Sequence, residues 1–200
     1  MKKLILAQFG ACSEISAGVL NDCDNPPVGG ADDRLIIYNF DDIESYTYNV
    51  TDPRIIESIV MKADKVGYVF EGKQQSNEPK QTLVKKKYNS SWDHEVTFKI
   101  FSGTPIAKAQ VEKMKDGKFI ALIQNNYQGV AGNGAFELYG KATGLYLEAS
   151  DRNIADTELL GAFNMVLKSS ELYKEPLLPN TVFVTSLAAT KIMVDGTITP

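Results

Sequence analysis

The sequence predicts a mainly β protein, built as a β-sandwich or barrel with one flanking α-helix and extended loops or arms. Nine Tyr and nine Phe residues, together with many Val, Ile and Thr, favour strands over helices. Short apolar or alternating runs follow one another without the strand–helix–strand rhythm of a parallel α/β fold. A 200-residue chain that is 44% hydrophobic can fill one sizeable core. We therefore expect a single domain over residues 1–200 with roughly ten strands.

The opening MKKLILAQFGAC has two interpretations. Two lysines, an apolar run and Cys12 after two small residues are the parts of a lipid-anchored export signal. Gln8 interrupts the apolar run before it reaches the about 7–15 residues that such a signal needs. The alternation over residues 3–7 therefore favours a short first strand. An exported surface lipoprotein, a β-sandwich binding module anchored at Cys12, is the alternative.

Two polar segments are expected to lie outside the core. Residues 13–33 include NDCDNPPVGGADD, which indicates a long ordered loop or a segment that docks on a neighbour. Residues 71–91 contain few apolar side chains and the three consecutive lysines Lys85, Lys86 and Lys87. This polar arm is either a solvated hairpin tip, whose lysines discourage edge pairing, or an arm that reaches an adjacent subunit.

The strands of the first half follow from local patterns. Residues 43–50 mix polar and apolar side chains on both sides, which is typical of a strand exposed on both faces. The KADK sequence between two apolar runs indicates a hairpin turn. In WDHEVTFKIF, alternation places Val96, Phe98 and Ile100 inward. The expected strands are residues 34–40, 43–50, 54–61, 66–70 and 92–101.

One helix is predicted, from Thr104 to Asp116. Thr104 can cap the first turn, Pro105 suits the first helical position, and Gly117 ends the helix. The lysines and Glu112 face water, so the helix should lie on a sheet through one narrow stripe. The residues of that stripe are Ile106, Ala107, Gln110, Val111 and Met114.

The second half alternates strands with glycine-rich turns. KFIALIQNN, residues 118–126, is apolar on both faces and should be a central strand. GVAGNG forms a loop, residues 135–149 a strand, a glycine-flanked turn and a second strand, and residues 159–167 a further strand. After two prolines, residues 182–196 are expected to form a closing strand with a short turn of helix.

The residues that could carry chemistry do not form a recognisable constellation. His94 is the single histidine, so it has no second imidazole with which to share a metal ion. Asp93 and Glu95 project to the opposite face of an extended chain from His94. We expect a structural or surface histidine; a small-molecule enzyme that uses His94, or His94 paired with Cys12 or Cys23, is the rival interpretation.

The remaining motifs lack essential parts. Gly140-Lys141 is followed by Ala142, where a phosphate-binding loop needs Ser or Thr. GVAGNG leads into a strand, so no helix N-terminus is available to hold a phosphate. The acidic run lacks the central glycine and terminal glutamate of a calcium loop. Its residues are Asp151, Asn153, Asp156 and Glu158. We therefore expect no catalytic, cofactor-binding or metal-binding residues, no cofactor and no enzymatic activity.

The net charge, the length of the apolar runs and the cysteine content limit the classes of partner that we expect. A net charge of −4 argues against a nucleic-acid-binding protein, which normally presents a basic face. No apolar run approaches the roughly 18 residues of a membrane span, so no membrane partner is expected. Cys12 and Cys23 match no zinc spacing. They could bridge in an oxidising compartment, although two buried free thiols is the favoured interpretation.

Residues 118–172, from KFIALIQNN through GLYLEAS to LLGAFNMVL, resemble the C-terminal half of tail-tube and tail-ring proteins of tailed bacteriophages, especially those of Bacteroidetes hosts. The segment NPPVGGADDRLIIYNFDDI is similar to the opening of such virion proteins. The resemblance implies a β-sandwich or barrel with a flanking helix, assembled in rings without catalysis. It assigns no individual functional residue.

The resemblance also implies partners and location. The chain would be a virion structural protein, assembled in the bacterial host cytoplasm into a homo-oligomeric ring or tube of about six or twelve copies. Other tail or connector proteins would join it, and DNA would pass through the lumen without specific binding. Residues 13–33 and 71–91 are the expected arms between subunits, which strand addition can fix to a neighbour.

Overall fold

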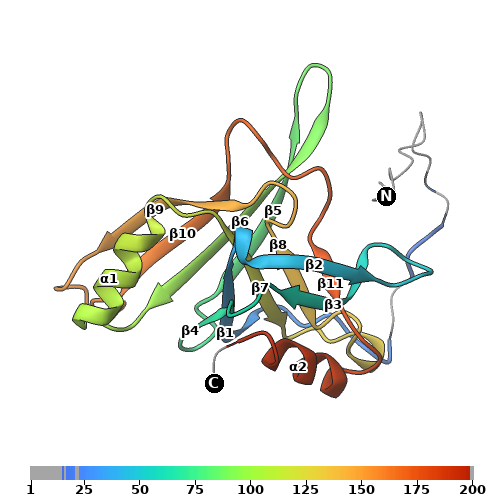
Figure 1. Cartoon of the computed structure of the whole chain (residues 1–200), viewed down its shortest axis with the longest axis horizontal. Helices are drawn as coiled ribbons and strands as arrows, with labels where there is room; N and C mark the ends of the chain where they lie inside the picture. The colour runs from blue at the N-terminus through green and yellow to red at the C-terminus, as the bar shows by residue number, and fades with distance from the viewer. Residues whose placement is uncertain (1–14, 16, 21–22, 199–200) are drawn as a thin grey trace.

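The structure is a computed structural model that describes Ile15, residues 17–20 and residues 23–198. These residues form eleven strands and two α-helices (Figure 1). The strands are β1 (Ala31–Asn39), β2 (Ile43–Tyr48), β3 (Ile55–Met61), β4 (Tyr68–Glu71), β5 (Glu78–Lys85), β6 (Ser90–Ile100), β7 (Phe119–Asn125), β8 (Phe136–Tyr139), β9 (Leu145–Arg152), β10 (Phe163–Ser169) and β11 (Asn180–Val182). The helices are α1 (Pro105–Met114) and α2 (Leu187–Asp195). The predicted first strand, residues 3–7, lies outside the described residues.

The strands pair into two groups that meet at β7. One group runs β2-β3-β11-β8-β7-β1-β4, and the other runs β9-β10-β6-β5. They are joined where Phe119 of β7 pairs with Leu145 of β9, the single register pair between those strands. The chain bends sharply there, so the two groups pack as the layers of a sandwich-like fold (Figure 1). The prediction of a mainly β fold with a flanking helix is confirmed.

The core has two parts, one on each face of the larger group. The first part lies between the two groups and contains Leu35 and Ile37 of β1 with Phe98 of β6. The second lies between the larger group and α2, and contains Ile36 of β1 and Val194 of α2. Strand β7 contributes to both parts, because its successive side chains point to opposite faces. Its prediction as a central strand, apolar on both faces, is confirmed.

The helices differ from the sequence prediction in number and in packing. α1 starts after Thr104, whose hydroxyl accepts a hydrogen bond from the Ala107 amide at 3.3 Å, as predicted. Its predicted stripe is only partly correct, because Met114 is buried but Ile106 is 75% exposed. Residues 182–196 were expected to form a closing strand with a short turn of helix; the strand ends at Val182 in β11, and the helical part is longer than predicted. Ser186 caps a full second helix there, α2, which covers the second part of the core.

Two hairpins expected from the sequence do not form. The KADK turn is present, but β4 pairs with β1 and not with β3, because both edges of β3 are taken by β2 and β11. Strands β8 and β9 follow one another along the same edge of β7 instead of pairing together. The bend between them requires Gly140 (φ 75°), where a Cβ atom would lie 2.5 Å from Leu145 Cγ.

Two buried tyrosine hydroxyls on the second part of the core offer a matched test. Tyr38 Oη donates to Thr197 Oγ1 at 2.7 Å, whereas Tyr46 Oη is buried without a hydrogen-bond partner among the described residues. Tyr38→Phe should therefore lower the free energy of unfolding by about 1 kcal/mol, and Tyr46→Phe should leave it unchanged or raise it. Urea unfolding of both variants checks this; equal losses in the two would contradict it.

Candidate functional site

The β5–β6 hairpin projects from the body of the molecule and is the most distinctive feature of its surface (Figure 1). β5 pairs with β6 from Glu78↔Thr97 to Lys85↔Ser90 and with no other strand of the described residues, which leave its outer edge free. The Lys86 amide donates to the Asn89 carbonyl at 2.8 Å and closes the turn. The sequence prediction of a polar hairpin within residues 71–91 is therefore confirmed, and its contact with a neighbouring subunit stays a prediction.

The hairpin tip is basic and carries exposed apolar side chains. Between Pro79 and Trp92 the chain has four lysines and no carboxylate. Tyr88 is 87% exposed, and Lys87 Nζ lies 5.0 Å from the centroid of its ring. Leu83 is also exposed on β5. An exposed Tyr among lysines that form no ion pair with the described residues presents a surface that suits contact with an acidic and partly apolar partner.

The base of the hairpin is held by the loop that follows β10. Trp92 and Glu175 exchange two backbone hydrogen bonds of 2.7 and 2.9 Å. The buried Glu175 carboxylate accepts three further hydrogen bonds from the turn between β8 and β9, two from the Ala142 and Thr143 amides and one from the Thr143 hydroxyl. One residue therefore fixes the hairpin to both groups of strands.

His94 lies on the inner face of β6, close to this connection. Its side chain is buried, and Nδ1 accepts a hydrogen bond from the Gly140 amide at 3.2 Å, so the proton sits on Nε2. Nε2 donates to the Leu177 carbonyl at 3.0 Å. Burial lowers the pKa of His94, which keeps the ring neutral despite the nearby Glu175 charge. Both nitrogens are occupied by backbone groups, so His94 is a structural histidine, as predicted.

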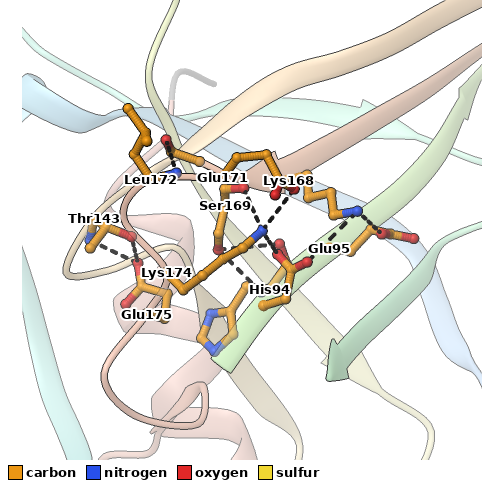
Figure 2. A network of polar contacts seen from close by, with 11 residues as sticks. His94, Glu95, Thr143, Lys168, Ser169, Glu171, Leu172, Lys174 and Glu175 are labelled. Carbon is orange, nitrogen blue, oxygen red and sulfur yellow. Dashed lines mark hydrogen bonds and ion pairs between the residues drawn. The ribbon is translucent and has the colours of Figure 1, made fainter. Parts of the chain in front are cut away.

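A network of ion pairs covers the opposite face of β6 (Figure 2). Lys174 Nζ lies 3.0 Å from Asp93 Oδ1 and 3.2 Å from Glu171 Oε1, and its side chain is almost fully buried. Lys168 Nζ lies between Asp93 and Glu95 at 3.7 and 3.4 Å. The loop after β10 therefore contacts both faces of β6, through Leu177 on one face and Lys174 on the other. Asp93 and Glu95 point away from His94, as predicted. These contacts give the hairpin a rigid base.

The structure also places the other motifs considered from the sequence. Cys23 is a free, exposed thiol, so the prediction that it is buried was wrong, and Cys12 lies outside the described residues. In the acidic loop, the Asp156 carboxylate accepts hydrogen bonds from the Glu158 and Leu159 amides. GVAGNG forms a short turn around Val130–Gly132, followed by β8. Leu159, expected on the apolar face of a strand over residues 159–167, instead lies in the turn before β10, which begins at Phe163.

A cavity of about 690 Å³ opens between α1, β1 and β4. Its walls are mainly apolar, with Lys113 and Gln110 at its polar side, and the lining includes no histidine, cysteine or carboxylate. The cavity therefore does not join His94 to any acid–base partner. Its lining residues are Ile37, Asn39, Gly67, Tyr68, Val69, Phe70, Gln110, Lys113, Met114 and Phe119.

Within the part of the chain that the structure describes, no three His, Cys, Asp or Glu side chains form a group that could hold a metal ion. Neither described helix is long and apolar enough to cross a membrane. Comparisons with protein families, with curated proteins and with solved structures gave no match for this chain.

Sequence reasoning missed Glu175 and Lys174. The sequence shows them only as polar residues before Pro176, in a segment without periodicity. Their partners, Thr143 and Asp93, lie more than thirty residues away in the chain. A charged pair directly before a proline-rich segment is a weak signal, and no local pattern indicates that both side chains are buried.

Proposed function

We propose that this chain is a virion structural protein of a phage tail, which assembles with copies of itself into a ring or tube that forms the DNA conduit. The projecting β5–β6 hairpin carries the proposal. An isolated two-stranded hairpin is at best marginally stable in water, so its free edge and exposed Leu83 and Tyr88 gain stability by packing on another surface.

Two further features support assembly. Ile15, Val19 and Leu20 of the N-terminal segment are each more than 90% exposed, which is typical of a segment that packs on a neighbour. The net charge of −4 suits a conduit that lets DNA pass without gripping its phosphates. The tail assignment itself rests on the sequence resemblance described above, and the sandwich-like fold agrees with what that resemblance implies.

The test is the oligomeric state of the purified chain. Light scattering after size-exclusion chromatography and negative-stain electron microscopy should show closed rings or tubes as the concentration rises. A matched variant replaces residues 84–91 with Asn-Gly, which joins the paired residues Leu83 and Trp92 through a tight turn. This variant should stay folded by circular dichroism and remain monomeric. A wild-type chain that is monomeric at every concentration, with no rings in the images, contradicts the proposal.

A further inference from the structure

The β9–β10 loop lies at the opposite end of its sheet from the hairpin tip. Phe163 pairs with Ile100 at one end of β6, and Lys85 pairs with Ser90 at the other. β6 has eleven residues, so the two ends are separated by roughly 35 Å at the rise of an extended strand. Two surfaces at opposite ends of one sheet can repeat head to tail from copy to copy.

The loop exposes large apolar side chains beside carboxylates. Ile154 is 77% exposed and Leu160 67% exposed, and Asp151 and Glu158 are exposed around them. The neighbouring cation is turned away, because Arg152 Nε donates to the Gly161 carbonyl and its guanidinium stacks on Phe163. The surface is therefore acidic and apolar, the complement of the lysines and Tyr88 at the tip.

The conformation of Leu160 adds to this argument. Its φ of 52° lies in the left-handed region, which a bulky side chain rarely adopts. The structure thus holds an apolar side chain in an unfavourable backbone conformation and leaves it in water. Strained backbone conformations of this kind cluster at functional sites, which is consistent with a contact at this loop.

We propose that the lysine tip of the β5–β6 hairpin docks on the β9–β10 loop of a second copy of this chain, with Tyr88 packed on Ile154 and Leu160. The proposal rests on the self-assembly proposed above and names its interface. Charge complementarity favours a second copy: the three tip lysines, Lys85, Lys86 and Lys87, leave the rest of an acidic chain still more negative. A heterologous contact of this kind closes into a ring when its rotation allows.

A charge swap tests the interface. One variant carries Lys85→Glu, Lys86→Glu and Lys87→Glu, and the other carries Asp151→Lys and Glu158→Lys; Asp156 is kept because it caps the loop. In sedimentation velocity each variant alone should associate at least about tenfold more weakly than wild type, and an equimolar mixture should recover association. A control replaces Lys62, Lys115 and Lys191, exposed lysines elsewhere, with Glu and should assemble normally.

The outcomes separate the two proposals. Wild-type rings that persist in both swapped variants, or a mixture of folded variants that does not reassemble, overturn the interface and leave the self-assembly intact. A wild-type chain that stays monomeric contradicts both the self-assembly and the proposed interface. The wild-type chain can also be tested for binding to a short DNA duplex by fluorescence anisotropy. If it binds the duplex while the variant with glutamates at positions 85–87 self-associates as strongly as wild type, the partner of the tip is a nucleic acid and the interface is overturned.

Leu160→Asn should weaken self-association without loss of folding stability.

Discussion

Replacing Glu175 with alanine should lower the free energy of unfolding by about 3 kcal/mol. The carboxylate is only 3% exposed and accepts hydrogen bonds of 3.1, 2.7 and 2.8 Å from Ala142 and Thr143. Without it, the turn between β8 and β9 loses its acceptor and buried donors are left unpaired, which costs more than the loss of an exposed hydrogen bond. Urea unfolding followed by the fluorescence of Trp92, the single tryptophan, measures the change at the hairpin base.

Glu171→Ala is the matched control. Its side chain is 77% exposed and its ion pair with Lys174 is therefore screened, so the free energy of unfolding should change by about 0.5 kcal/mol or less. Glu175→Gln keeps the shape but turns one acceptor into a donor, and should fall between the two. Similar losses for Glu175→Ala and Glu171→Ala would contradict the role assigned to the buried carboxylate.

The His94→Ala variant should lose about 3 kcal/mol near pH 8, and this loss should shrink as the pH falls. The substitution removes the buried ring and leaves the Gly140 amide and the Leu177 carbonyl without their partner. Burial lowers the pKa of His94 in the folded chain below the 6.5 of an exposed histidine. Between these two pKa values the unfolded chain holds more protons, so wild-type stability falls with falling pH.

The difference between wild type and His94→Ala isolates this effect from carboxylates that titrate in both proteins. The contribution of His94 to the free energy of unfolding is complete above pH 6.5 and is lost as the pH falls. The free energies of unfolding of wild type and His94→Ala, measured from about pH 8 to pH 5, should therefore converge. His94→Gln does not titrate but can both donate and accept, so it should recover part of the stability lost in His94→Ala. Because neither variant titrates at this position, the free energies of unfolding of the two variants should differ by the same amount at every pH. If the free energies of unfolding of wild type and His94→Ala differ by the same amount at every pH, folding does not change the pKa of the His94 ring, and the prediction is wrong.

The elements that the sequence predicted correctly depend on neighbouring residues. Alternation in WDHEVTFKIF placed Val96 and Phe98 in the core, since successive side chains of a strand point to opposite faces. The cap at Thr104 and the polar hairpin within residues 71–91 followed from residue types and turn chemistry. The second helix was predicted only as a short turn after a closing strand because Leu187–Asp195 mixes small and apolar residues, although Ser186 was available as a cap signal.

What the sequence by itself determined is the mainly β class, the approximate position of most strands, where the first helix begins and that residues 71–91 form a polar segment outside the core. The tertiary structure alone decided that β4 pairs with β1, that β8 and β9 belong to different groups of strands, and that Glu175 is buried under the turn at Thr143. The physical reason is that alternation specifies the face of a strand but not its edge partner. The surroundings of a charge depend on segments that only folding brings together.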